Sequence, residues 1–117
     1  MSDVDTLVDE WLTLPEVAER LQLPVTRVRQ LLSDRQLIAV RRGGNNALMV
    51  PADFVQDGRV LKGLPGTLTL LQDARYEDDE SLRWLFTPDE SLPGSPVAAL
   101  VANRGTEVKR RAQALGF

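Results

Sequence analysis

The chain has 117 residues, of which 43% are hydrophobic and 26% charged, as in one ordinary folded domain. It contains no cysteine and no histidine, which excludes disulfides, Cys/His zinc sites and catalytic triads that need either residue. We therefore expect neither an enzyme nor a bound cofactor or metal. No apolar run approaches the roughly 20 residues that span a bilayer, and the acidic start is unlike a secretory signal. A cytoplasmic protein with no membrane partner is expected.

The net charge of −3 is unevenly distributed along the chain. The first 13 residues carry four acids and no base, whereas residues 14–50 carry six arginines against three acids, a local charge of +3. Attraction to phosphates is local, so a basic segment of an acidic protein can bind duplex DNA. A solvated arginine-rich surface without a ligand is the alternative interpretation.

In chain order, residues 1–10 are predicted to form a flexible acidic tail. A short helix is then expected over residues 14–22, because apolar side chains recur there at helical spacing. Pro15 suits a first helical position, and Thr13 with Glu16 three residues later has the spacing of a capping box. These signals place the start of the helix directly after Thr13.

A second helix is predicted from about Val25 to Ser33, because Pro24 cannot continue the first one. Val28 lies on its apolar side, together with two leucines. The side chains off that side, which would face the major groove, are Thr26, Arg27, Arg29 and Gln30. Two short helices with a three- or four-residue turn and an exposed, basic second helix are typical of a helix–turn–helix.

A β-hairpin is predicted directly after the second helix. Residues 37–42 and 47–50 have the composition of strands, and the GGNN segment between them tolerates the positive φ of a tight turn. A hairpin in this position is a wing, whose tip Asn45 and Asn46 would shape. The side chains placed to reach phosphates or the minor groove are Arg35, Arg41 and Arg42.

The second half is predicted to be helical, with helices over residues 64–74, 78–86, 96–102 and 106–115 separated by turn signals. Four consecutive acids, residues 77–80, precede or begin the second of these helices. Negative charge is favoured at a helix N-terminus, and this interpretation is preferred over a metal site.

Residues 12–54 resemble the excisionase and MerR-like winged helix–turn–helix family, in which a segment like LTLPEVAERLQLPVTRVRQLLSDRQLIAVRRGGNNALMVPADF supplies two helices and a wing. The resemblance implies a fold that binds duplex DNA. The turn departs from the family pattern, since Pro24-Val25-Thr26 replaces a small polar run. A helix pair and a hairpin with no nucleic-acid role is the alternative.

Residues 14–117 resemble a family of actinobacterial winged-helix DNA-binding proteins that includes a substrate of a membrane Ser/Thr protein kinase. The segments that carry this resemblance are PVTRVRQLL, LIAVRRGG, VLKGLPGTLTLLQDARYEDDESLRWLFTPDESL and EVKRRAQALGF. It implies DNA binding that a Ser/Thr protein kinase switches off by phosphorylating a threonine in the N-terminal tail, where Thr6 is the candidate. The alternative is that Thr6 is an ordinary tail residue.

Residues 82–115 are similar to the C-terminal domain of Xre/ParS-type antitoxins, with Pro88-Asp89 where that family has Pro-Asn. This resemblance implies dimerisation or binding of a protein partner. The alternative is a helical cap that completes the core, in which Trp84, Leu85 and Phe86 pack internally.

Together these patterns predict an α+β fold that is mostly α: a winged helix–turn–helix with a two-stranded wing, followed by a helical C-terminal half. The expected division is a tail over residues 1–10, a DNA-binding domain over 11–60 and a helical domain over 61–117. The expected function is double-stranded DNA binding by a transcriptional regulator or nucleoid-associated factor. A protein-interaction module working through the C-terminal helices is the alternative. A homodimer is left open, because such domains commonly read paired half-sites but no heptad run indicates a coiled coil.

Overall fold

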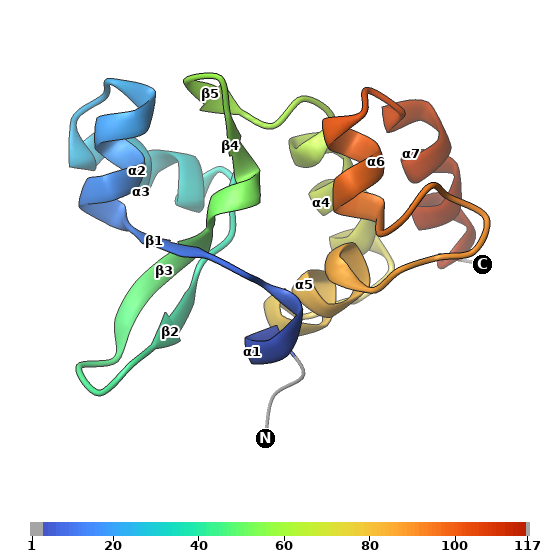
Figure 1. The fold of residues 1–117 in the computed structure, drawn as a ribbon, viewed down its shortest axis with the longest axis horizontal. Helices are drawn as coiled ribbons and strands as arrows, with labels where there is room; N and C mark the ends of the chain where they lie inside the picture. The colour runs from blue at the N-terminus through green and yellow to red at the C-terminus, as the bar shows by residue number, and fades with distance from the viewer. Residues whose placement is uncertain (1–3, 117) are drawn as a thin grey trace.

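The computed structural model describes residues 4–116, in which two halves lie side by side around one continuous core (Figure 1). The first half carries two small sheets and three short α-helices, and the second half is helical. The elements in chain order are α1 (Val4–Leu7), β1 (Trp11–Thr13), α2 (Leu14–Leu21), α3 (Val25–Ser33), β2 (Val40–Arg42), β3 (Ala47–Pro51), the 3₁₀ turn η1 (Ala52–Phe54), β4 (Val55–Gln56), β5 (Arg59–Val60), α4 (Leu64–Asp73), α5 (Asp78–Phe86), α6 (Pro96–Val101) and α7 (Gly105–Ala114). This confirms the predicted fold class.

Helix α2 begins directly after Thr13, where the capping box predicted from the sequence is present. The Glu16 amide donates to Thr13 Oγ1 at 3.3 Å, and the Thr13 amide donates to Glu16 Oε1 at 2.8 Å. Gln22 ends the helix in the left-handed conformation, with φ 56°. Pro24 then precedes α3, so a three-residue turn joins the two helices and the predicted helix–turn–helix is confirmed.

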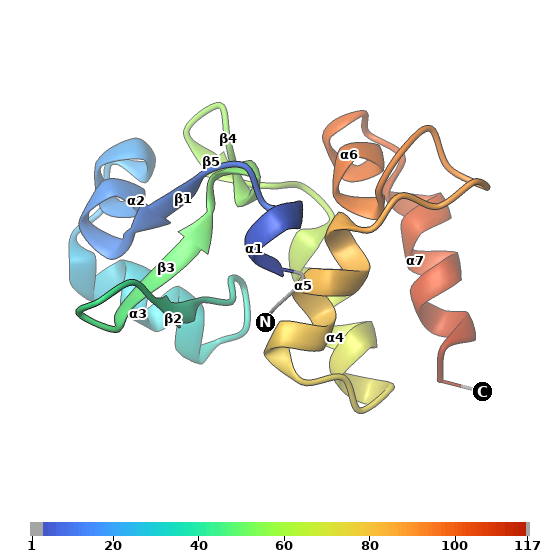
Figure 2. The same cartoon turned by 60° about the horizontal axis from the view of Figure 1, so that its bottom comes forward.

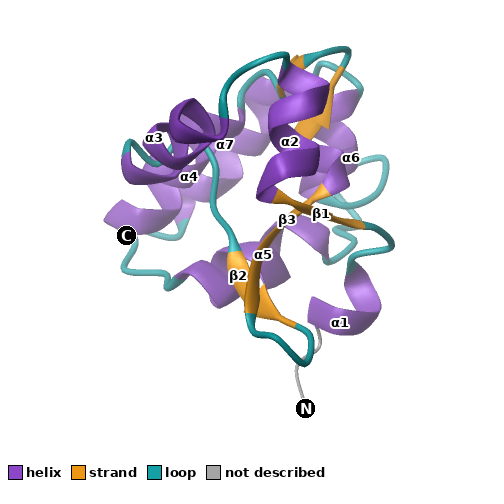
Figure 3. Ribbon diagram, turned by 90° about the vertical axis from the view of Figure 1, so that its left-hand side faces the viewer, coloured by secondary structure: helices purple, strands orange, loops and turns teal. Residues whose placement is uncertain are grey.

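Helices α2 and α3 differ in how much of their surface is buried. Helix α2 buries four side chains, among them Val17, which is fully covered. Helix α3 buries only Val28, while Leu31 and Leu32 are half-buried beside the core. The rest of α3 therefore lies at the surface, on the side of the molecule that faces the reader in Figure 3 together with the hairpin below it.

The predicted wing is the antiparallel pair of β2 and β3, in which Val40 faces Met49 and Arg42 faces Ala47. Strand β2 begins at Val40, where its pairing with Met49 starts, rather than at residue 37, and Leu37 and Ile38 before it are buried in the core. The unpredicted strand β1 pairs with the other edge of β3 and gives a three-stranded sheet of order β1-β3-β2. The wing therefore extends outward from a sheet that is anchored at its base.

A second, shorter hairpin of β4 and β5 lies outside the predicted elements and leads into the C-terminal half. Its turn is Asp57-Gly58, with φ of 53° and 78°, the pattern that a tight hairpin turn needs. The Leu61 amide donates to the Phe54 carbonyl at 2.8 Å, which closes the hairpin onto η1. The β4–β5 hairpin therefore connects the two halves of the molecule beside the hydrophobic core.

The four predicted C-terminal helices are confirmed as α4 to α7, with ends that differ by a residue at most. Helix α4 packs against α7 and α5, and α6 packs against α5 and α7 (Figure 2). The buried side chains of α7 are Val108 and Ala112, and its exposed residues include Thr106, Lys109 and Arg110.

The expectation of a flexible tail over residues 1–10 is wrong for its described part. Residues Val4–Leu7 form α1, which packs against α5, and Val8 is 3% exposed. The prediction relied on the acidic residues of this segment and overlooked the apolar pair Leu7 and Val8, which packs into the core of the second half. Residues 1–3 lie outside the described part of the chain.

One hydrophobic cluster runs through both halves of the molecule. Phe54 from η1 and Phe86 from α5 meet across the junction, with ring centroids 5.8 Å apart and a 37° angle between the planes. The salt bridge from Arg35 Nη1 to Asp78 Oδ1, at 2.6 Å, spans the same junction nearer the surface. The end of α3 is therefore held directly by the first residue of α5.

Candidate nucleic-acid interface

A hollow of about 390 Å³ separates the start of α2 from the wing and is bordered by α3. Arg29 of α3 and Arg41 of β2 contribute cationic side chains to it from two different elements. The full lining is Thr13, Leu14, Pro15, Arg29, Arg41, Asn45, Asn46, Ala47 and Leu48. No acidic residue is among them, so the hollow presents positive charge and hydrogen-bond donors on a concave surface.

The predicted groove-facing residues of α3 are all exposed in the structure. Thr26, Arg29 and Gln30 lie on one side of the helix at spacings of three and four residues, and Arg27 lies at the edge of that side. Gln30 Nε2 donates to Asp34 Oδ1 at 3.0 Å, which orients the amide along the helix. This outward side contains no carboxylate within α3 itself.

The wing tip is a tight turn in which Gly43 and Asn46 take left-handed conformations, with φ of 81° and 55°. The Asn46 amide donates to the Gly43 carbonyl at 3.1 Å and closes the turn. Arg41 Nη1 donates to the Asn46 carbonyl, also at 3.1 Å, so the turn positions the guanidinium of the wing. Asn45 and Asn46 thus shape the tip, as the sequence predicts, and both also line the hollow.

Arg42 lies on the opposite face of the wing from Arg41, because successive side chains of a strand alternate. Its guanidinium carbon lies 4.2 Å from the centroid of the Trp11 ring. This cation–π contact connects the wing to β1. Arg42, predicted with Arg41 as a contact with phosphates or the minor groove, therefore does not line the hollow with Arg29 and Arg41.

Arg35 is also placed differently from the expectation. Its salt bridge with Asp78 leaves the arginine side chain 27% exposed and the aspartate side chain 44% exposed. Asp78 lies 43 residues further along the chain, so no local pattern could have shown the pair. The guanidinium, predicted as a contact with phosphates or the minor groove, is paired in the structure with Asp78, between the end of α3 and α5.

The start of α2 contributes residues to the hollow that the sequence analysis did not assign, namely Thr13 and Pro15. The Thr13 backbone amide and then its hydroxyl hold the pKa of the neighbouring Glu16 carboxyl below its usual value. Its backbone hydrogen bond ties this carboxylate to the helix end at 2.8 Å. The start of α2 lies beside the wing because β1, which ends at Thr13, pairs with β3, and no local signal in the sequence showed this pairing.

The helices and acidic side chains of residues 4–116 also bear on other kinds of site. No helix there has the length and apolar character needed to cross a membrane. Within the same residues, no three acidic side chains come together in a way that would hold a metal ion.

The helix–turn–helix with its adjoining hairpin defines a winged helix–turn–helix protein, here with a helical C-terminal half packed against it. A family model described as "DNA-binding protein Rv2175c, wHTH domain" matches residues 2–55. A second model, described as "Rv2175c C-terminal domain of unknown function", matches residues 61–116. The chain belongs to the Rv2175c family.

Similar proteins agree with this assignment. The chain is 47% identical to DNA-binding protein Rv2175c of Mycobacterium tuberculosis (strain ATCC 25618 / H37Rv) in an alignment that covers 89% of this chain and 79% of that protein. Its fold is similar to the NMR structure of Rv2175c, with a TM-score of 0.82 and 43% identity over 93% of this chain and 82% of that one. The family and the arrangement of both halves are therefore shared with a protein whose fold has been solved.

Proposed function

We propose that the chain binds duplex DNA by placing α3 in a major groove and the wing in the adjoining minor groove. The observation that carries the proposal is that Arg29 of α3 and Arg41 of the wing line one hollow with no acid in its lining. A B-DNA major groove is about 12 Å wide and accepts an α-helix, while the phosphate ridge beside it carries regularly spaced negative charge. The hollow between α3 and the wing suits that ridge.

Each predicted site residue takes a definite role under this proposal. Thr26, Arg27 and Gln30 face base edges or the groove walls from the exposed side of α3, and Arg29, which lines the hollow beside them, contacts phosphates of the groove wall. Arg41 contacts phosphate, and Asn45 and Asn46 hold the wing tip in the shape that lets it enter the minor groove. Arg42 is displaced toward Trp11 and serves the outer phosphates at most.

The biological role that fits this surface is a transcriptional regulator or nucleoid-associated factor. The resemblance to the excisionase and MerR-like family supports the same placement of the wing. Genome-wide occupancy distinguishes the two roles, because a regulator occupies few sites and a nucleoid factor occupies many. Two copies on paired half-sites are proposed by analogy with other helix–turn–helix proteins, and the mass of the complex by sedimentation tests that stoichiometry.

An antitoxin-type interaction module has less support. The Trp84-Leu85-Phe86 segment, expected to pack internally if these helices only complete the core, is largely covered: Leu85 is 0% exposed, Phe86 is 7% exposed and Trp84 is half-buried. These side chains complete the packing of α5 and leave no apolar surface for a partner at that point. Capture of a stoichiometric protein partner after nuclease treatment, by a chain that does not bind DNA, would favour the module instead.

The proposal is tested by DNA cleavage from reagents tethered to the protein. The sequence has no cysteine, so Gln30→Cys and Asn45→Cys each carry an iron chelate at one chosen position. On the duplex that binds most tightly from a random pool, cuts from position 30 are expected in one major groove. Cuts from position 45 are expected in the next minor groove, roughly five base pairs away. A reagent at Gln72→Cys, on the exposed side of α4, is the control. Unfocused cutting from positions 30 and 45 would contradict the proposal.

Control by phosphorylation is proposed for Thr6, which is exposed on α1. A phosphate adds about −1.5 to −2 charges near a surface that must approach DNA. Replacing Thr6 by Glu is expected to weaken duplex binding roughly two- to fivefold at low salt, with the difference vanishing as salt screens the charge. Fluorescence anisotropy measures the effect, and Thr6→Gln is the matched neutral control. Equal affinities of the two variants at every salt concentration would exclude an electrostatic switch at this position.

A further inference from the structure

The α6–turn–α7 segment repeats the local design of α2–turn–α3. The first helix of each pair, α2 or α6, begins after a residue whose hydroxyl accepts a hydrogen bond from the backbone amide three residues later. The Ala98 amide donates to Ser95 Oγ at 3.2 Å, and the Glu16 amide donates to Thr13 Oγ1 in the same way. Each also has proline in its first turn. Each is followed by three residues that include one left-handed residue, Gln22 with φ 56° or Asn103 with φ 65°. The C-terminal half thus contains a second helix–turn–helix arrangement.

The second helices of the two units also present the same kinds of side chain. The fourth residue of each is a fully buried valine, Val28 in α3 and Val108 in α7. The exposed second, fifth and sixth residues are Thr26, Arg29 and Gln30 in α3 and Thr106, Lys109 and Arg110 in α7. The outward side of α7 therefore carries polar and cationic side chains at the same helix positions as the outward side of α3.

A cationic hollow adjoins this side of α7. Its volume is about 350 Å³, and its lining is Lys62, Gly63, Asn103, Gly105, Thr106 and Lys109, with no acid. A Cβ on Gly66 of α4 would lie 2.9 Å from Lys109 Cε, so the lysine crosses closely over that glycine. Glu107, the acid of α7, points instead to Arg104, at 3.4 Å.

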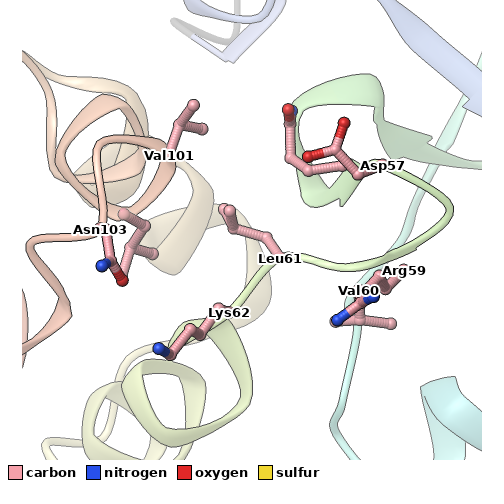
Figure 4. A pocket seen from close by; sticks show the side chains of 9 residues that line it. Asp57, Arg59, Val60, Leu61, Lys62, Val101 and Asn103 are labelled. Carbon is pink, nitrogen blue, oxygen red and sulfur yellow. The ribbon is translucent and has the colours of Figure 1, made fainter.

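The charge continues past Lys62 toward the β4–β5 hairpin. Lys62 and Asn103 also line a neighbouring hollow of about 430 Å³, where the segment between β5 and α4 faces the α6–α7 turn (Figure 4). Arg59 lies on its far side, and Asp57 is the acid in that lining. Lys62 and Lys109 thus border the outward side of α7, and Arg59 lies beyond the second hollow.

We propose that the outward side of α7, with Lys62, binds the phosphate backbone of a second duplex DNA segment. Helices α3 and α7 lie at opposite ends of the long dimension of the molecule, which measures 36 Å (Figures 1 and 2). Two such surfaces on one chain hold two duplex segments together. The inference rests on the proposed function for the first segment and assigns DNA bridging to the C-terminal half.

A capture assay tests the bridge. A biotinylated duplex on beads retains a fluorescent duplex only when protein links the two. Wild-type protein is expected to retain it at low salt, and Lys109→Ala/Arg110→Ala is expected to lower retention at least ~5-fold. Binding of the same variant to one duplex, measured by anisotropy, is expected to change less than ~2-fold, since α3 and the wing are untouched.

Two control variants separate charge on α7 from charge in general. Arg20→Ala/Arg75→Ala removes two exposed cations that lie away from α7 and is expected to bridge normally. Lys109→Arg/Arg110→Lys keeps the charge and is expected to bridge as well, because phosphate contacts need no particular cation. Circular dichroism verifies that each variant is folded.

The outcomes distinguish the bridge from the proposed function. Failure of wild-type protein to bind a single duplex overturns the proposed function and the bridge together. Single-duplex binding without capture overturns the bridge alone. The bridge is also overturned if the Lys109→Ala/Arg110→Ala variant captures the second duplex as well as wild type does. Bridging would then be assigned to a dimer, or the outward side of α7 would be assigned to binding an acidic protein.

Discussion

Replacing Arg29 and Arg41 together by alanine is expected to reduce duplex affinity by roughly 30-fold, whatever the DNA sequence. The two guanidiniums line the same hollow from α3 and from the wing, so they contact one phosphate ridge and its groove. A loss of about 1 kcal/mol for each side chain, the low end for an arginine that contacts DNA, gives that factor. Anisotropy with a fluorescent duplex at low salt measures it.

The Arg75→Ala/Arg104→Ala variant is the control for loss of charge alone. It changes the net charge by the same amount, at positions away from the hollow between α3 and the wing. That variant is expected to bind within ~2-fold of wild type, because only cations near the phosphates release counterions. If both variants lose affinity equally, the effect belongs to net charge, and the placement of α3 and the wing on one duplex is wrong.

Truncation of Phe54 to alanine is expected to destabilise the whole chain by about 3–5 kcal/mol, the range for a buried phenylalanine. Phe54 is 0% exposed and its ring meets Phe86 of α5, so the lost volume lies where the two halves share their core. A small domain has about 5–15 kcal/mol of stability in total, so this single change removes a large part of it.

Urea unfolding measures this loss and shows whether the halves unfold together. Trp11 reports on the first half and Trp84 on the second, and each is followed alone after the other is changed to phenylalanine. Coincident transitions are expected, because one hydrophobic cluster spans both halves. Val101→Ala is the control, since that side chain is 49% exposed and its loss leaves no cavity. Two separate transitions, with only one shifted by Phe54→Ala, would contradict the shared core.

The helices were predictable because their signals are local. Thr13, Pro15 and Pro24 placed the ends of α2 and the start of α3 through capping and backbone constraints that act within a few residues. The glycine and asparagine turn likewise placed the wing tip. The exposed side of α3 followed from helical periodicity alone, since Val28 had to face inward.

The parts that were missed depend on distant residues. Strand β1 is three residues long and exists because β3 offers it an edge. Arg35 forms a salt bridge with Asp78, and Arg42 lies over the Trp11 ring. Counting arginines in the sequence therefore overstated how many of them face the hollow with Arg29 and Arg41. The hairpin at Asp57-Gly58 did carry a turn signal, but its strands of two residues are too short for periodicity to show.

The central claim is that guanidiniums from α3 and from the wing neutralise phosphates of the same duplex, and the salt dependence of binding tests it most directly. For wild type and Arg29→Ala/Arg41→Ala, the logarithm of the association constant is measured against the logarithm of salt concentration. Two lost phosphate contacts predict a slope shallower by about 1.8 in the variant, at roughly 0.9 for each phosphate. Parallel lines for the two proteins would show that neither side chain touches the DNA backbone.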